Sequence, residues 1–180
     1  MKAGYGISIG LAAALLAASG CAQEEETQFG ESQAALFSGA AFYDSGSQCT
    51  VGGVTMHCCP YKNGMLTVMV GARIDQNVFK CQPIGLAQNS DTSFLDTSTQ
   101  RNNMHACPFG SLMRGLHVGL NDLTCLYPQH QPLTEFVDNG TQDGYPMHVC
   151  GQNGTSNTYA MAGINVSQNK FSCDTDGLPN

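Results

Sequence analysis

The chain has 180 residues, of which 42% are hydrophobic and 12% are charged, with a net charge of −7 at pH 7 and nine cysteines. This length and hydrophobic content suffice for one domain with a single core. Its seven Lys and Arg residues are scattered and outnumbered by 14 acidic residues. The chain therefore lacks the basic surface that binds nucleic acids or anionic lipids, and we expect neither as a partner.

The N-terminal segment has the pattern of an export signal. Lys2 precedes an apolar run from about residue 7 to residue 18, which is too short for a permanent membrane helix. The sequence ASGC that ends at Cys21 resembles the lipobox of bacterial lipoproteins. This resemblance implies that residues 1–20 are removed and that Cys21 is acylated. Ala22 after the cysteine then implies the outer membrane; the alternative is ordinary signal cleavage and a soluble secreted protein.

Residues 21–35 include the run AQEEETQFGESQ, which is acidic, polar and free of any apolar pattern. Such a composition is typical of a solvated tether. Residues 36–180 then form the folded domain. Without Cys21 this domain contains an even number of cysteines, which in an exported protein predicts a framework of four disulfides.

Three units of similar sequence make up the domain, at residues 42–81, 94–125 and 136–173. Each unit begins with Phe-x-Asp, written FYD, FLD and FVD in chain order. Each then reaches a Met-His pair, in MHCCP, MHACP and MHVCG, and closes on the frame M-x-G-x5-N-x-(F/L)-x-C. Three copies in a fixed frame predict three equivalent structural units.

Each unit is expected to end in an independent β-hairpin. The residues around M-x-G alternate between apolar and polar, which predicts a half-buried strand with one polar face. The apolar face is expected to hold Val68, Val70, Ala72 and Ile74; Leu112, Leu116 and Val118; and Ala160, Ala162, Ile164 and Val166. The glycine of the frame indicates a bulge or a close backbone approach. The aspartates that begin the units, Asp44, Asp96 and Asp138, are expected to form turns.

The repeat also predicts how the cysteines pair. One cysteine of each unit follows Met-His and another ends the hairpin, which gives Cys59–Cys81, Cys107–Cys125 and Cys150–Cys173. Cys49 and Cys58 remain as a fourth bridge in the first unit. The alternative joins Cys58 to Cys81 and Cys49 to Cys59, because neighbouring cysteines are hard to assign from spacing.

The second unit resembles the repeat of the vitelline membrane outer layer protein family. The matching residues are Cys107, Pro108, Gly110, Gly115, Asn121, Leu123 and Cys125. This resemblance implies a β-prism, in which three sheets surround a pseudo-threefold axis and four disulfides hold them. The fold predicted is therefore all-β, disulfide-stabilised and threefold, with a β-trefoil as the alternative. The family is not an established enzyme class.

The repeated Met-His pairs are the candidate metal ligands. If the units close around an axis, His57, His105 and His148 could converge with Met56, Met104 and Met147, and imidazole with thioether would suit copper or zinc. The alternative is structural, because a residue beside a half-cystine repeats when it packs under the same hairpin each time.

The sequence contains no G-x-S-x-G, H-E-x-x-H or phosphate-loop motif, so we expect no enzyme and no obligatory cofactor. The lipid anchor, the disulfide-linked repeats and a neutral polar surface favour a lectin-like binding or structural module of the cell envelope. Its partner would be a glycan or an envelope protein. A copper- or zinc-binding protein is the alternative function.

Overall fold

The computed structural model describes residues 39–128, 134–143, 147–151 and 159–174. The predicted signal peptide, Cys21 and the acidic tether lie outside this part of the chain. The described residues form an all-β fold with two 3-10 helices, η2 (Ile74–Gln76) and η3 (Gln88–Ser90). Within them no helix has the length and hydrophobicity of a membrane span.

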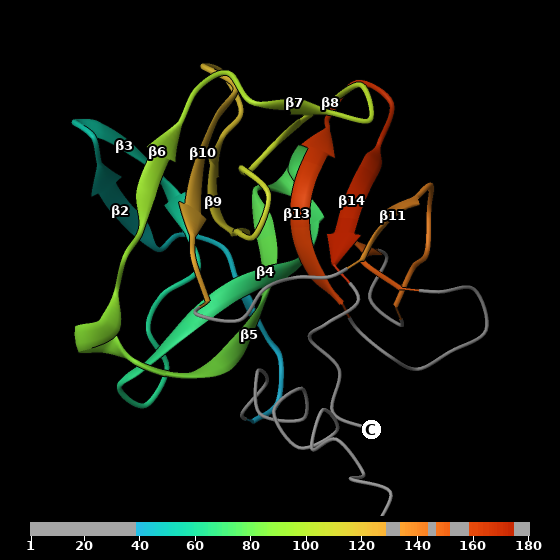
Figure 1. Cartoon of the computed structure of the whole chain (residues 1–180). Coiled ribbons are helices and arrows are strands. Elements are labelled where there is room, and N and C mark those ends of the chain that lie inside the picture. Colours follow the sequence, from blue (N-terminus) through green and yellow to red (C-terminus); the bar gives the residue numbers. More distant parts are fainter. Residues whose placement is uncertain (1–38, 129–133, 144–146, 152–158, 175–180) are drawn as a thin grey trace, which may run out of the picture.

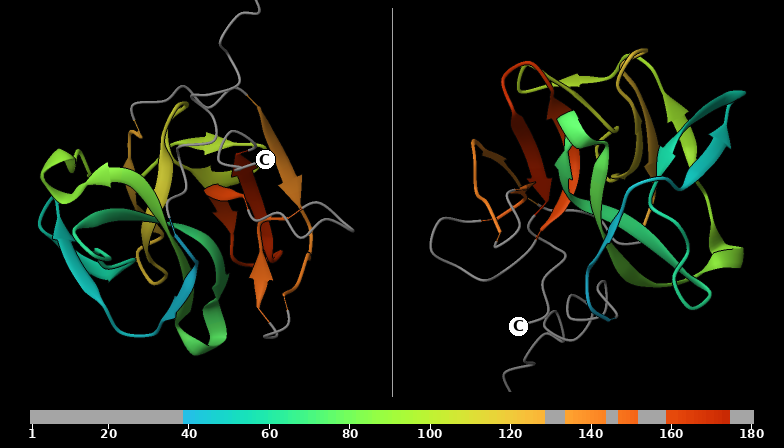
Figure 2. Two further views of the ribbon diagram at one scale, coloured as in Figure 1. Left: turned by 90° about the horizontal axis from the view of Figure 1, so that it is seen from below. Right: turned by 180° about the vertical axis from the view of Figure 1, so that it is seen from behind.

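The strands form three antiparallel sheets, shown in Figures 1 and 2. The first sheet has the order β1 (Phe42–Asp44), β5 (Val78–Ala87), β4 (Met65–Arg73) and β12 (His148–Val149). The second has the order β2 (Gln48–Val51), β3 (Val54–Cys58), β9 (Leu112–His117), β10 (Asp122–Leu126) and β6 (Phe94–Asp96). The third has the order β11 (Glu135–Asp138), β14 (Lys170–Asp174), β13 (Ala160–Asn165), β8 (Met104–Ala106) and β7 (Gln100–Arg101).

Each sheet is built on one of the predicted hairpins: β4–β5, β9–β10 and β13–β14. In each, the Phe-x-Asp strand pairs with the second strand of the hairpin in the same register, which aligns Phe42 with Cys81, Phe94 with Cys125 and Phe136 with Cys173. The hairpin turns contain Asn77, Asn121 and Asn169 at φ values of 52°, 56° and 50°. Asn tolerates this left-handed conformation better than most side chains, which explains its place in the frame.

A β-bulge interrupts the first strand of each hairpin inside the M-x-G frame. In the first hairpin Met69 pairs with Cys81 and Gly71 with Lys80, so Val70 is the extra residue. Arg114 and Ala162 take the same place in the other two hairpins. The bulge shifts the alternation of side chains by one position. The prediction of a single apolar face along each strand is therefore wrong: Val68 packs in one hydrophobic cluster, and Met69 and Ala72 pack in another.

The Met-His strands are exchanged between units, so the prediction of independent hairpins is wrong. Strand β3 of the first unit pairs with β9 of the second, β8 of the second with β13 of the third, and β12 of the third with β4 of the first. The three units thereby close a ring of strand pairings. Gly163 faces the crossing strand, and a Cβ there would lie 2.6 Å from the Ala106 Cβ and 2.9 Å from the His105 carbonyl oxygen. The glycine of the frame permits this close approach.

The four predicted disulfides are present: Cys49–Cys58, Cys59–Cys81, Cys107–Cys125 and Cys150–Cys173. Because the Met-His strands are exchanged, the three repeated bridges join different sheets. Cys107, for example, follows β8 of the third sheet and is bonded to β10 of the second. The N–H of Cys107 also donates to the carbonyl oxygen of the bulged residue Ala162 at 2.8 Å. Covalent and hydrogen bonds thus hold the ring closed at the same points.

The main hydrophobic cluster lies between the three hairpins. It contains the methionine of each M-x-G frame and the six cysteines of the repeated bridges. It also contains the residue two positions before each final cysteine, which is Phe79, Leu123 or Phe171. Equivalent residues from all three units therefore share one core. The predicted inward face of each second strand, such as Phe79 with Cys81, is confirmed.

Candidate functional site

The three histidines of the Met-His pairs each bind an aspartate of their own unit. The Nε2 atoms of His57, His105 and His148 lie 2.7, 2.8 and 2.5 Å from carboxylate oxygens of Asp44, Asp96 and Asp138. All three imidazoles are buried. Each carboxylate is an acceptor, so Nε2 carries the proton that forms this bond.

The same aspartates form the turns predicted from the sequence. Asp138 accepts hydrogen bonds from the N–H groups of Gly140 and Thr141 and from the Thr141 hydroxyl. Burial alone would raise the pKa of Asp138, but the hydrogen bonds from Thr141, Gly140 and His148 outweigh it and hold the pKa below its usual value. The hydroxyl binds the carboxylate and not the imidazole, so the group is a structural turn rather than an activated nucleophile.

The pKa values of Asp44 and Asp96 are lowered in the same way. Burial raises them, and hydrogen bonds from the hydroxyls of Ser47 and Thr99, from the paired histidines and from turn N–H groups more than offset it. The three Asp–His pairs are thus one structural device present in each unit.

The structure does not assemble the histidines and methionines into a metal site. Each histidine belongs to a different sheet and is committed to its own aspartate. Met56, Met104 and Met147 are buried, and Met56 Sδ accepts a hydrogen bond from Thr124. Within the described ranges no three His, Cys, Asp or Glu side chains form a group that could hold a metal ion.

A pocket of about 560 Å³ lies where the second unit departs from the repeat. The bulged residue is Val70 in the first hairpin and Ala162 in the third, but Arg114 in the second. Arg114 is only 4% exposed. Because a bulge redirects the side chain that it carries, Arg114 lies in the wall of the pocket.

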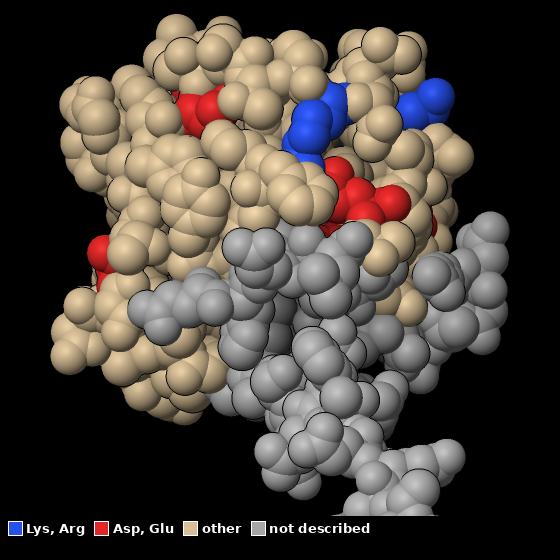
Figure 3. All heavy atoms as spheres, viewed as in Figure 1, with Lys and Arg blue, Asp and Glu red and all other residues tan. Residues whose placement is uncertain are grey.

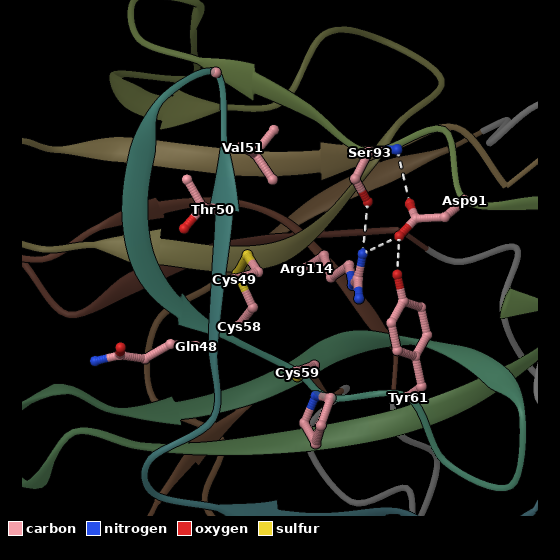
Figure 4. A pocket seen from close by; sticks show the side chains of 12 residues that line it. Gln48, Cys49, Thr50, Val51, Cys58, Cys59, Tyr61, Asp91, Ser93 and Arg114 are labelled. Atoms are coloured by element: carbon pink, nitrogen blue, oxygen red, sulfur yellow. Dashed lines mark hydrogen bonds and ion pairs between the residues drawn. A yellow bond between two sulfur atoms is a disulfide. The ribbon is translucent and has the colours of Figure 1, made fainter.

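Asp91, Ser93 and Tyr61 hold the Arg114 guanidinium (Figure 4). One terminal nitrogen donates to the Asp91 carboxylate and, at 3.0 Å, to the Ser93 hydroxyl. The guanidinium carbon lies 4.5 Å from the centre of the Tyr61 ring, and the Tyr61 hydroxyl donates to Asp91. Burial raises the pKa of Asp91, but hydrogen bonds from Ser93 and Tyr61 and the charge of Arg114 lower it overall, so the carboxylate is ionised. The pair therefore carries no net charge.

The opposite wall of the pocket comes from strand β2 and the bridge that only the first unit has. Along this strand the Val51 side chain and the Cys49–Cys58 disulfide lie on the side of Arg114, whereas the Gln48 and Thr50 side chains point to the other side (Figure 4). The Tyr61 side chain at the rim is 38% exposed. The pocket thus combines the Ser93 hydroxyl, a neutral ion pair and one accessible aromatic ring.

Sequence reasoning placed Arg114 in the M-x-G frame but gave it no role. The available signal was a basic residue at a position that holds Val70 and Ala162 in the other copies. Asp91 and Ser93 lie outside the repeat units, and their contact with Arg114 depends on the turn at η3, so the pattern alone could not place them.

No protein-family model, curated protein or solved structure matches this chain.

Proposed function

We propose that this protein is a lipoprotein anchored at the cell envelope through Cys21, and that its folded domain binds a neutral glycan in the Arg114 pocket. The main support for a glycan ligand is that Arg114 is buried at a position where the other two units have small apolar residues. Its Nε atom is buried and has no hydrogen-bond partner among the described residues. A buried donor without a partner is costly, and a bound ligand would satisfy it.

The chemistry of the pocket suits sugar hydroxyls. A hydroxyl both donates and accepts, so it can bind the Arg114 N–H groups and the Asp91 carboxylate at once. The exposed Tyr61 ring offers an apolar face to the C–H groups of a pyranose. Because Asp91 neutralises Arg114, a neutral ligand fits better than an anionic one. A volume of about 560 Å³ is within the range of small-ligand sites.

The charge distribution on the face in Figure 3 is consistent with an exported binding module. On the face in Figure 3 most described residues are neither acidic nor basic, and the basic side chains near the centre of the view lie against acidic ones. Such a surface offers little long-range attraction to polyanions. The four disulfides are typical of proteins that function outside the reducing cytosol.

A glycan array with the purified protein tests the proposal. Arg114→Val gives the second unit the residue type of the first, and we expect it to keep the fold and weaken glycan binding at least tenfold. Arg114→Lys retains a charge opposite Asp91 but loses the planar donor group, and we expect an intermediate loss. Arg73→Val removes an arginine from the end of strand β4, where it pairs with the exposed Asp75, and serves as the matched control.

The glycan assignment is wrong if the array shows no binding while envelope pull-downs recover a protein partner. It is also wrong if Arg114→Val and Arg73→Val bind the same glycans equally well. Circular dichroism of each variant separates a loss of binding from a loss of fold.

A further inference from the structure

The second unit differs from the other two at its histidine as well as at its bulge. His57 Nδ1 lies 3.0 Å from the Asn77 amide oxygen, and His148 Nδ1 lies 3.2 Å from that of Asn169. The equivalent Nδ1 of His105 is buried and has no partner among the described residues. Asn121 occupies the matching turn position but does not reach it.

The second unit also lacks the phenylalanine on which the histidine stacks in the other two units. His57 stacks on Phe79 and His148 on Phe171, with ring centres 3.9 and 3.8 Å apart. Leu123 stands at the same position of the second unit, so His105 has no equivalent stacking partner. His105 is nevertheless 3% exposed, and its Nε2 is fixed on Asp96.

A pocket of about 300 Å³ lies beside His105, between the hairpin turns of the second and third units. Both His105 and Asn121 line it, together with Gln100, Asn103, Asn165 and Ser167. Asn165 is fixed by its bonds to the Asn103 carbonyl oxygen and the Ser167 hydroxyl. None of the described residues that line this pocket is Asp, Glu, Lys or Arg.

The lack of a partner for His105 Nδ1 in the described part of the chain and the uncharged polar lining of the pocket favour a ligand with hydroxyl groups. With Nε2–H donating to Asp96, a neutral His105 presents a lone pair at Nδ1, whereas a protonated one presents an N–H. A hydroxyl can satisfy either form, because it both accepts and donates. Side-chain amides have the same dual capacity, and a lining without charges does not favour ions.

We infer that this pocket is a second ligand site, which binds one neutral sugar ring or a polyol of similar size through His105 Nδ1 and Asn121. It is separate from the Arg114 pocket, with which it shares no lining residue. The two sites would allow one molecule to contact a glycan at two points. The inference does not require that the Arg114 site binds a sugar.

Two-bond ¹H–¹⁵N spectra of histidine-labelled protein test this inference, with glucose, galactose and myo-inositol as probes. We expect a saturable shift of the His105 Nδ1 resonance with at least one probe. The His57 and His148 resonances should stay in place, because asparagine already occupies their Nδ1 atoms. Asn121→Ala should weaken the apparent affinity at least fivefold, whereas the matched variant Asn169→Ala should leave the His105 titration unchanged.

The Arg114→Val variant separates the two sites. The His105 titration should persist in it, whatever the glycan array shows for the Arg114 pocket. Absence of a His105 shift with all three probes in the folded protein would overturn the inference. Equal shifts of all three histidines would do so too, as would a crystal structure at saturating sugar in which His105 Nδ1 contacts only a water molecule.

Discussion

Replacing Gly163 by alanine tests whether the exchanged strands determine the stability of the domain. The new Cβ would lie 2.6 Å from the Ala106 Cβ, 2.9 Å from the His105 carbonyl oxygen and 3.0 Å from the Ala106 Cα. Strand β8 cannot simply move away, because the Cys107–Cys125 bridge and the Cys107 N–H bond to Ala162 hold its end. The added methyl group must therefore be accommodated by strain in two paired strands.

The expected loss is about 2–3 kcal/mol. Overpacking of a well-packed site costs about 1–3 kcal/mol, and contact with a fixed backbone belongs at the upper end of that range. The smaller conformational entropy of the unfolded alanine chain offsets this by about 0.5 kcal/mol. At about 3 °C per kcal/mol, the melting temperature should fall by about 6–9 °C.

The assay is thermal and urea unfolding of the oxidised protein, followed by circular dichroism. Gly46→Ala is the matched control, since a Cβ at Gly46 would meet nothing within 4 Å. Adding Ala106→Gly to Gly163→Ala removes the nearest of the three contacts and should restore about half of the lost stability. If Gly163→Ala unfolds at the same temperature as Gly46→Ala, the close approach of the exchanged strands is not what requires glycine.

The remaining predictions concern the anchor, a disulfide and the Asp–His pairs. The mature protein should begin at an acylated Cys21 and partition into detergent; N-terminal mass spectrometry checks this, and a Cys21→Ala variant with unchanged membrane fractionation would contradict it. Replacing Cys107 and Cys125 together by serine should lower the free energy of unfolding by about 2–5 kcal/mol in a denaturant titration. The lowered pKa values of Asp44, Asp96 and Asp138 stabilise the fold at neutral pH, and this contribution is lost as the pH falls below the usual carboxyl range, about pH 4. Asp138→Asn should therefore be less stable than the parent at pH 7, and the difference should shrink in acid; a constant difference across the titration would argue against the pairing.

The repeat in the sequence predicted the parts of the fold that are local to one unit. The hairpins, their turns and the bridge between Cys107 and Cys125 all follow from residues in one copy. The glycine in the frame was interpreted as a bulge or a close backbone approach, and in the third unit both occur: the bulge at the preceding Ala162 and the close approach at Gly163. The resemblance to the vitelline membrane outer layer family stays a prediction.

The relations between units could not be predicted from this pattern. A period-two alternation carries no information about which strand lies alongside, so the exchange of β3, β8 and β12 was missed. The bulge then changed which side chains face the core. Arg114 was given no role and His105 was predicted only as a metal ligand, for a related reason: a repeat indicates what the copies share, whereas both pockets lie where one copy differs.

The ring of strand pairings fixes how many copies the chain needs. In a linear repeat protein, units can be added or removed at an end, because each contacts only its neighbours. Here the Met-His strand of the third unit completes the first sheet. Deleting any one unit therefore leaves one of the two remaining hairpins without a Met-His strand beside it. It also leaves one remaining Met-His strand without a hairpin to pair with. A peptide containing a single unit would have to associate as a trimer to make the same pairings. The copy number is thus a property of the closed architecture, and a gene that encoded two or four such units would require a different fold.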